Sequence, residues 1–536
     1  MPKSSEEERS TMSTDSAATA ATRIADGYAV DGQALELGTV VVDGAADPTA
    51  QIRIPLATIN RHGLVAGATG TGKTKTLQLI AEQLSAAGVP VLMADVKGDL
   101  SGLSRPGEGN DKTAARAKDT GDDWAPTGFP VEFLSLGTKG IGVPIRATVE
   151  SFGPVLLSKV LGLNATQEST LGLIFHWAKD QNRPLVTTDH LRSAIGYLTS
   201  DEGKEALKSL GGVSATTAGV ILRALVNLDA EGGDTFFGEP KLDPNDLLRT
   251  NDQGQGIISL LEFTGQSVRP VIFSTFLMWL LADLYTQLPE VGDVDRPKLV
   301  FFFDEAHLLF ADASKAFLEQ VEQTVKLIRS KGVGVFFCTQ LPTDIPNDIL
   351  SQLGARVQHA LRAFTPDDQK ALSRTVRTYP KTDVYDLESA LTSLGIGEAV
   401  VTVLSEKGAP TPVAWTRMRV PRSLMASIGT GDIEAAAKKS PLQAKYGQTA
   451  TQPAQPQAAP APQAQPAPQP PQTQAGYPPV PPNEPVPPMP EPAEPKGPKG
   501  PSMWEEVLQN PTVKSGINTA IREAVKSIFG SGRRRK

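Results

Sequence analysis

The sequence predicts an α/β fold in which a mainly parallel sheet is covered by helices on both faces. Three observations support this. A glycine-rich loop at 67–74 lies between a short apolar run and a helical pattern. From there to about residue 405, strand-like runs alternate with helical segments, an order typical of parallel βαβ units. The 536 residues are 40% hydrophobic, which is sufficient for a sizeable core.

The amino-terminal half divides into three parts. Residues 1–22 are small, polar and charged, which predicts a disordered tail. Residues 23–147 open with two short β-branched strands and hold the first part of the core; a loop is expected at about 104–127. Residues 148–235 lose strand character and place apolar residues at helical spacing, which predicts an α-helical insertion.

Residues 236–430 are expected to complete the core. Within them, the apolar run 271–288 is interrupted by polar residues and is too short to span a bilayer unbroken, so it predicts a buried helix. Residues 431–501 are rich in Pro, Ala and Gln and predict a disordered linker. Residues 502–536 regain helical periodicity with basic residues, which predicts an amphipathic basic helix at the carboxyl end.

Charge and cysteine content exclude several classes of protein. The formal net charge of -7 argues against a wholly basic nucleic-acid coat protein, although it allows a local basic groove. The single cysteine, Cys338, excludes an internal disulfide framework and a multi-cysteine zinc site, and it suits a reducing cytosol. The first residues contain no apolar stretch of the kind found in secretory signals. We therefore expect a cytoplasmic protein.

One motif predicts a nucleotide site, and it matches the pattern G-x-x-x-x-G-K-[ST]. Glycines allow the backbone to wrap around a polyphosphate, and the following helix adds the positive end of its dipole. The lysine would reach the β- and γ-phosphates and the hydroxyl would coordinate Mg²⁺. The alternative, a chance match, is disfavoured by the flanking strand and helix patterns. The residues expected to bind ATP are Gly67, Ala68, Thr69, Gly70, Thr71, Gly72, Lys73, Thr74 and Lys75.

A second motif supplies acidic groups. Lys298 is followed by an apolar run, LVFFF, and Asp304 and Glu305 come directly after that run. An aspartate at a strand tip beside a phosphate loop can hold hydrated Mg²⁺, and the adjacent glutamate can polarise a water for attack on the γ-phosphate. The alternative is an ordinary solvated turn. Lys73 and Asp304 are 231 positions apart (304 minus 73), and the helical insertion accounts for much of this separation.

Three further polar residues have two interpretations each. Gln340 follows the strand-like run VGVFFCTQ and would either sense the γ-phosphate or cap a turn. His307 follows the acidic pair and would either couple nucleotide state to another part of the chain or simply pack. Asp95 ends a strand, where ligands bind in open α/β sheets, or it caps a turn.

Basic residues suggest two roles. An arginine contributed by a neighbouring subunit can stabilise charge in phosphoryl transfer, and Arg329, Arg356 and Arg362 are candidates, although single arginines more often form surface ion pairs. Positive loops could also follow the phosphates of a nucleic acid. The segment 112–118 and the group Lys326, Arg329 and Lys331 are candidates for that role, with solvated faces as the alternative.

Several runs together resemble the HerA–FtsK class of P-loop ATPases, and more closely its bacterial HerA-like group, over about 50–425. They are GATGTGKT, ADVKGDL, LVFFFDEAHLLF, IRSKGVGVFFCTQ and DILSQLGARVQHALRAFTPDDQ. The resemblance implies a RecA-like ATPase core that assembles into a ring, usually a hexamer, and moves along duplex DNA. About 60 residues precede the phosphate loop, too few for the barrel domain of HerA itself.

The resemblance also implies roles for individual residues. Lys73 and Thr74 fall on the phosphate and Mg²⁺ positions, and Asp304 falls on the metal-associated acid. Glu305 falls on the catalytic base. The sensor position corresponds to Gln340, and Arg362 lies nearest the arginine that acts across the subunit boundary.

Two functions remain open. The first is a ring-forming, ATP-hydrolysing motor that acts on DNA as a translocase or helicase-like enzyme. The second is an ATPase that remodels or moves protein partners, or a nucleotide-gated scaffold. The linker and the terminal basic helix would suit tethering to a protein partner or to an anionic membrane surface.

Overall fold

A twelve-stranded sheet organises the part of the chain that the computed structural model describes. That part is residues 18–447, apart from 96–97, 207, 209–210, 263–269 and 293. It belongs to a compact unit, Met1–Gln457, and a second unit comprises Ala458–Lys536. The predicted helix at 502–536 and most of the predicted linker therefore lie outside the described residues.

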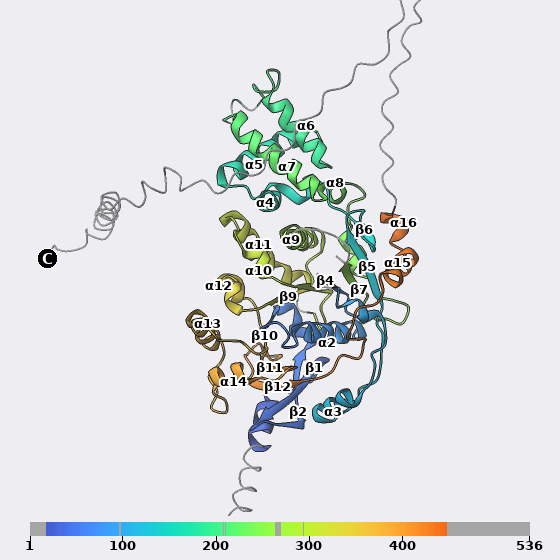
Figure 1. The fold of residues 1–536 in the computed structure, drawn as a ribbon, viewed down its shortest axis with the longest axis vertical. Helices are drawn as coiled ribbons and strands as arrows, with labels where there is room; N and C mark the ends of the chain where they lie inside the picture. The colour runs from blue at the N-terminus through green and yellow to red at the C-terminus, as the bar shows by residue number, and fades with distance from the viewer. Residues whose placement is uncertain are drawn as a thin grey trace, which may run out of the picture. The chain divides into compact units, whose positions relative to one another are not determined.

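Most of the sheet is parallel, as the sequence predicts (Figure 1). Eight neighbouring strands run parallel, in the order β10 (Ala355–Gln358), β3 (Gly63–Ala66), β9 (Val333–Thr339), β8 (Leu299–Phe303), β4 (Val91–Asp95), β7 (Ile258–Glu262), β5 (Val131–Leu136) and β6 (Val143–Ile145). An antiparallel group extends the sheet beyond β10, in the order β11 (Glu398–Thr402), β12 (Ala414–Met418), β1 (Ala34–Val42) and β2 (Ala45–Pro55).

The central strands β9, β8 and β4 are buried along their whole length and are mainly apolar, because both faces of the sheet are covered. Phe301 and Phe303 of β8 point to one face, where they pack with α9 (Pro270–Gln287) and α11 (Lys315–Ile328). Phe302 points to the other face and shares a core with α2 (Lys73–Ala86). The alternation of side chains along a strand thus builds two separate cores around one sheet.

Helix α9 contains the apolar run that the sequence predicts to be a buried helix. Phe276, Trp279 and Leu280 are each 1% exposed or less, and the Trp279 indole donates to the carbonyl oxygen of Ser151 at 3.0 Å. This prediction is confirmed. Within the described ranges, no helix has the length and apolar character needed to cross a bilayer.

A group of helices follows β6 and packs through α4 on α9 and α11 (Figure 1). Side chains of Thr148, Asn164 and Thr187 cap three of these helices by accepting bonds from the backbone of the first turn. The helices are α4 (Val149–Leu161), α5 (Ala165–Asp180), α6 (Thr188–Thr199), α7 (Ala215–Ala230) and α8 (Gly233–Phe236).

The remaining elements are short and connect or cover the sheet. They are η1 (Leu56–Arg61), η2 (Ser101–Ser104), α3 (Asp111–Thr120), η4 (Pro244–Leu247), α10 (His307–Phe310), η5 (Arg329–Lys331), η6 (Pro342–Asp344), α12 (Asn347–Leu350), α13 (Pro366–Val376), α14 (Leu387–Ser393), α15 (Thr430–Lys439) and α16 (Gln443–Tyr446).

Both predicted disordered boundaries are wrong by several residues. Residues 18–26 form a helix, and Ala21 is buried in a core, so 18–22 do not belong to the disordered tail predicted at 1–22. Within the linker predicted at 431–501, α15 and α16 account for residues up to 446. Ile433, Leu442 and Tyr446 are buried there, and the Tyr446 hydroxyl bonds Asp246. In each case a few apolar side chains outweigh the polar composition around them.

The loop expected over about 104–127 contains the helix α3. Asn110 caps it by accepting from the backbone N–H of Thr113 at 3.0 Å, and Gly121 ends it with a left-handed conformation. Asp119 then forms an ion pair with Arg417 of β12 at 2.8 Å. Caps and cross-links to distant segments therefore order a segment whose composition alone predicts a loop.

Candidate functional site

The predicted phosphate loop lies between the carboxyl end of β3 and the start of α2. Gly67, Gly70 and Gly72 have φ values of 150°, 81° and 119°, a region that favours glycine. A Cβ on Gly67 would lie 2.5 Å from Cβ of His359, which no real pair of atoms tolerates. The glycines are therefore required by backbone conformation and by the close approach of a neighbouring segment.

Backbone hydrogen bonds hold the loop against the ends of neighbouring strands. The N–H of Gly67 donates to Thr339 O at 3.3 Å, and the N–H of Ala68 donates to Ala360 O at 2.9 Å. On the other side of the loop, the N–H of Gly397 donates to Thr71 O at 3.1 Å. The loop is thus fixed in shape by the segments that follow β9 and β10 and by the turn before β11.

Two lysines at the start of α2 point in different directions. The ammonium of Lys73 lies within the curve of the loop, where it donates to Gly67 O at 2.7 Å and Ala68 O at 3.2 Å. Lys75 turns away and donates to Gln78 Oε1 and to Met425 O, both at 3.1 Å. Burial lowers the pKa of Lys75, although Asp99 and Asp95 oppose this effect. Lys75 can therefore offer a phosphate its backbone N–H, but its side chain is already engaged.

The acidic pair follows β8 at the same edge of the sheet. Strand β9 lies between β3 and β8, with Thr339 in register with Ala66 and Phe337 in register with Phe303. Glu305 has a φ of 48°, and its N–H donates to Asp304 Oδ1 at 2.9 Å. The parallel strands thus bring the acidic pair toward the phosphate loop across a single intervening strand.

Cys338 on that intervening strand links the two motifs. Burial raises the pKa of its thiol well above the ordinary value, and the charge of Asp304 and a hydrogen bond with its carboxylate add to the rise. Glu305 acts in the same direction, while the charge of Lys73 opposes it. The thiol therefore lies within electrostatic reach of the lysine and both carboxylates. The sequence gives no sign of this role, because a buried cysteine in a strand is ordinary.

Gln340 and His307 lie beside this group. The turn after β9 is capped by Asp344, which accepts from Thr339 Oγ1 at 2.7 Å and from the N–H of Leu341 at 3.0 Å. The capping role considered for Gln340 thus belongs to another residue, and the Gln340 side chain is exposed. His307 Nδ1 lies 3.5 Å from Glu305 Oε2, so an imidazole stands next to the candidate base.

Asp95, at the end of β4, caps the turn that follows this strand, which is one of the two roles considered for it. Its carboxylate accepts from the N–H of Asp99 at 3.0 Å and from the N–H of Leu100 at 2.7 Å. It is 1% exposed, and burial raises its pKa. These bonds use the carboxylate to shape the loop after β4.

The three candidate arginines separate into two places. Arg356 donates to Thr378 O at 2.8 Å and to Leu350 O at 3.4 Å, and it lines a pocket together with Arg329, far along the strands from the phosphate loop. Arg362 is exposed and lies two residues beyond Ala360, whose carbonyl binds the phosphate loop. Of the three, the structure places only Arg362 at the edge that carries the predicted site.

His359 is a supporting residue that the sequence did not single out. Its Nδ1 donates to Glu398 O at 2.8 Å, so its Nε2 accepts from the hydroxyl of Thr76 at 2.9 Å. Burial lowers the pKa of His359 to about 4, and the charge of Lys73 contributes. A neutral imidazole therefore braces α2 against the segment that follows β10. Its position directly after a strand is the one signal that could have revealed it.

A partly apolar pocket of about 360 Å³ adjoins the loop at Gly72. Its apolar lining comes from Ile396, Met418 and Met425, with Val420 and Pro421 beside them. Arg116 lines it too and donates to the carbonyls of Gly397 and Ile396 at 3.0 and 3.1 Å. The pocket offers a flat apolar group a place next to the phosphate loop. It is built from segments distant in sequence, which explains why no local motif predicts it.

The residues present fit Mg²⁺ better than a metal held by protein alone. Among described residues, no group of three or more His, Cys, Asp or Glu side chains could hold a metal ion. Mg²⁺ prefers oxygen ligands and keeps several waters, with one or two protein oxygens and phosphates completing its shell. The hydroxyl of Thr74 and the carboxylate of Asp304 are oxygen ligands of this kind.

Comparison with known proteins identifies related sequences and folds. The family model described as helicase HerA-like C-terminal matches residues 41–536. The solved structure of the unbound bacterial conjugative coupling protein TrwBdeltaN70 is similar, with a TM-score of 0.51 and 15% identity over 76% of this chain and 94% of that one. VirB4 of Thermoanaerobacter pseudethanolicus aligns with a TM-score of 0.45 and 13% identity over 73% of this chain and 97% of that one. No curated protein sequence matches.

Proposed function

Because the chain belongs to the helicase HerA-like C-terminal family, we propose that it hydrolyses ATP where the phosphate loop and the acidic strand meet. The observation that carries this proposal is the strand register, which brings the phosphate loop after β3 and the acidic pair after β8 to one sheet edge, with β9 between them. A glycine-lined loop, a lysine and two carboxylates at one sheet edge are the groups that phosphoryl transfer requires. The fold shared with TrwB is consistent with this assignment.

Each residue has a distinct task in this proposal. The N–H groups of 67–74 bind the phosphates, and Lys73 exchanges its carbonyl partners for β- and γ-phosphate oxygens. Thr74 and Asp304 would hold Mg²⁺, which when bound would neutralise charge on the phosphates. Glu305 orients and deprotonates the attacking water. Gln340, which is exposed between the loop and the acidic pair, senses the γ-phosphate.

The apolar pocket beside Gly72 is the proposed position of the adenine base. A base placed against Ile396, Met418 and Met425 would bury its faces while the phosphates lie in the loop. The turn at Gly397 contacts both the pocket and the phosphate loop. Gly397 lines the pocket, and its N–H donates to Thr71 O in the loop.

We also propose that the chain forms a ring, of which the hexamer is the expected form, with Arg362 acting on a neighbouring subunit. Arg362 is exposed and makes no ion pair with the described residues, which suits a partner outside its own chain. Two large apolar side chains are exposed at the same edge, Phe364 at 85% and Ile396 at 76%. A subunit contact there would bury both and bring the arginine to a second phosphate loop.

The proposed substrate of the motor is DNA, and protein remodelling is the alternative. Steady-state ATP hydrolysis by the full chain, with and without duplex or single-stranded DNA at two salt concentrations, separates them. Stimulation by DNA that weakens as salt rises supports a DNA motor, because phosphate contacts release counterions. Hydrolysis that is indifferent to DNA at both salts would favour the protein-directed function.

A further inference from the structure

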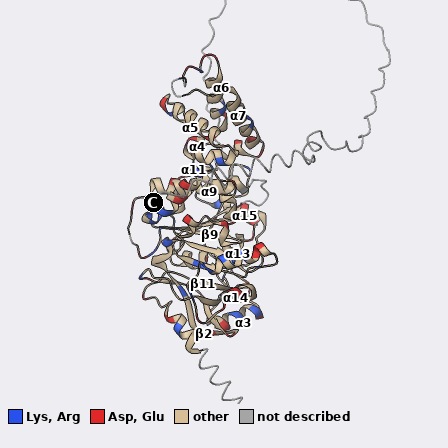
Figure 2. Cartoon of the chain, turned by 90° about the vertical axis from the view of Figure 1, so that its left-hand side faces the viewer, with Lys and Arg blue, Asp and Glu red and all other residues tan. Residues whose placement is uncertain are grey.

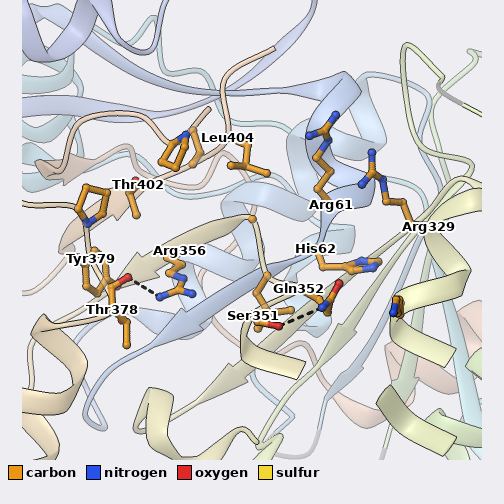
Figure 3. A pocket seen from close by; sticks show the side chains of 16 residues that line it. Arg61, His62, Arg329, Ser351, Gln352, Arg356, Thr378, Tyr379, Thr402 and Leu404 are labelled. Atoms are coloured by element: carbon orange, nitrogen blue, oxygen red, sulfur yellow. Dashed lines mark hydrogen bonds between the residues drawn. The ribbon is translucent and has the colours of Figure 1, made fainter. Parts of the chain in front are cut away.

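A second pocket lies at the opposite edge of the sheet from the phosphate loop (Figure 3). It is lined by residues that precede three adjacent parallel strands: Arg61 and His62 before β3, Arg329 before β9, and 351–354 before β10. The phosphate loop instead follows the carboxyl end of β3. The pocket has a volume of about 730 Å³, which is within the range of about 300–1,000 Å³ typical of small-molecule sites.

The charge of this pocket has one sign. Arg61, Lys326, Arg329 and Arg356 line it, and none of its sixteen described lining residues is an Asp or Glu. Elsewhere, acidic and basic side chains are interspersed over the described chain (Figure 2). Arg61 and Lys326 form no ion pair with any residue that the structure describes, and Arg356 bonds only carbonyl oxygens there. No carboxylate of the described residues therefore neutralises Arg61, Lys326 or Arg356.

The floor of the pocket is rigid and uncharged. His62 accepts from the N–H of Val335 at 3.1 Å through Nδ1 and donates to Val325 O at 2.7 Å through Nε2. Burial lowers the pKa of His62 to about 4, so this imidazole is neutral near pH 7. Through these two bonds, His62 joins α11 and β9 to the start of β3. Arg61 and the carboxyl end of α11 are thereby held next to each other at the pocket. The positive charge comes from the arginines and the lysine.

The other wall is apolar and aromatic. Tyr379, Pro380, Leu404 and Pro410 line the pocket, and Tyr379 is only 8% exposed. Figure 3 shows Arg61 and Arg329 on one side of the pocket, and Arg356 on the other side beside Thr378 and Tyr379. A ligand with an anionic end and a flat or apolar end would meet complementary groups at both ends.

We propose that this pocket binds a small phosphorylated molecule of nucleotide size, separate from the ATP bound at the phosphate loop. Arg61 and Lys326 hold its phosphate, since a guanidinium group binds phosphate oxygens in pairs, and Arg356 adds positive charge from the opposite side, where it bonds Thr378 O. Its organic part lies against Tyr379, Pro380 and Leu404. The enclosing walls and the volume favour a small molecule over a nucleic-acid duplex. The site is independent of the proposed hydrolysis, because it shares no residue with that machinery.

The test is calorimetric titration of the full chain with ADP and, separately, with inorganic pyrophosphate, on a Lys73→Ala background that weakens the phosphate-loop site. We expect residual binding in this background. The added substitutions Arg61→Gln and Lys326→Gln should weaken that binding by at least about tenfold. The matched control is Lys179→Gln with Lys315→Gln, which removes the same amount of positive charge from exposed helical positions outside the pocket. This control should leave the residual binding unchanged.

Further variants and probes keep the outcome decisive. Ser351→Glu places a carboxylate in the pocket from an exposed position, so it should weaken binding even if the double substitution perturbs folding. Tighter binding of ADP than of pyrophosphate supports a nucleotide, whereas equal binding supports the phosphate group alone as the ligand. No residual binding in the Lys73→Ala background, or residual binding indifferent to the pocket variants, overturns the proposal. So does a single-stranded oligonucleotide that binds the pocket more tightly than either small probe.

Discussion

Two buried histidines make the stability of this protein depend on pH in a defined window. His62 and His359 each have a pKa lowered from 6.5 to about 4 because burial disfavours the charged form. In the unfolded chain each histidine binds a proton as the pH falls below 6.5, whereas in the folded chain it stays neutral until about pH 4. The unfolded state therefore binds more protons between these values. Stability is fully present above pH 6.5 and is lost as the pH falls toward 4.

The size of the effect follows from the two pKa values. Near pH 5 the unfolded chain holds about 0.9 more protons per histidine than the folded chain, so each contributes a slope of about 1.2 kcal/mol per pH unit. Over the whole window each contributes about 3 kcal/mol. Replacing one histidine by a residue that does not titrate should remove one of these contributions, whatever the carboxylates of the protein contribute.

The assay is urea unfolding of wild type and His359→Gln at several pH values between 4.5 and 7.5. The plot of unfolding free energy against pH should be shallower for the variant by about 1.2 kcal/mol per pH unit near pH 5. His176→Gln, which changes a histidine whose side chain is 59% exposed, is the matched control and should keep the wild-type slope. A His359→Gln slope equal to that of wild type would refute the assignment of a neutral, buried imidazole beside the phosphate loop.

Three other predictions address the site and its surroundings. Lys73→Ala should weaken ATP binding by at least about tenfold, because it removes the ammonium inside the loop; fluorescence titration with a labelled nucleotide measures this, and unchanged affinity contradicts the phosphate role. Arg362→Ala should lower turnover by about 10³-fold, and mixing with subunits that keep Arg362 should restore part of it; full activity of an isolated monomer would exclude action across subunits. Tyr446→Ala should lower the unfolding free energy by about 3–5 kcal/mol in urea, because Tyr446 is fully buried and its hydroxyl bonds Asp246; a loss below about 1 kcal/mol would mean that α16 does not belong to the cooperative core.

Local motifs predict the parts of the site that lie in continuous sequence. The phosphate loop was identified because its glycines, Lys73 and Thr74 occupy adjacent positions between a strand and a helix. The acidic strand was identified because Phe303 ends an apolar run and two carboxylates follow. The mainly parallel sheet and the buried helix α9 follow from the same kind of periodicity, and the structure confirms both.

The remaining features arise from contacts between distant segments. His359 braces Thr76 across 283 positions, and its place directly after a strand is the one local signal of that role. Strand β12 lies between β11 and β1 in the antiparallel group, yet its short pattern does not stand out in the sequence. Helix α3 and the helices α15 and α16 occur in polar segments, where a cap or a few buried apolar side chains decide the outcome. Composition averages over such residues, which explains why the predicted boundaries were wrong there.

The central claim is that Lys73, Asp304 and Glu305 form one site of ATP hydrolysis with Glu305 as the base. The most direct measurement is single-turnover hydrolysis of ATP with Mg²⁺ by wild type and Glu305→Gln, with nucleotide affinity measured on the same samples. We expect the variant to bind ATP with near wild-type affinity and to hydrolyse it about 10²- to 10⁴-fold more slowly. Hydrolysis by Glu305→Gln at the wild-type rate would contradict the account.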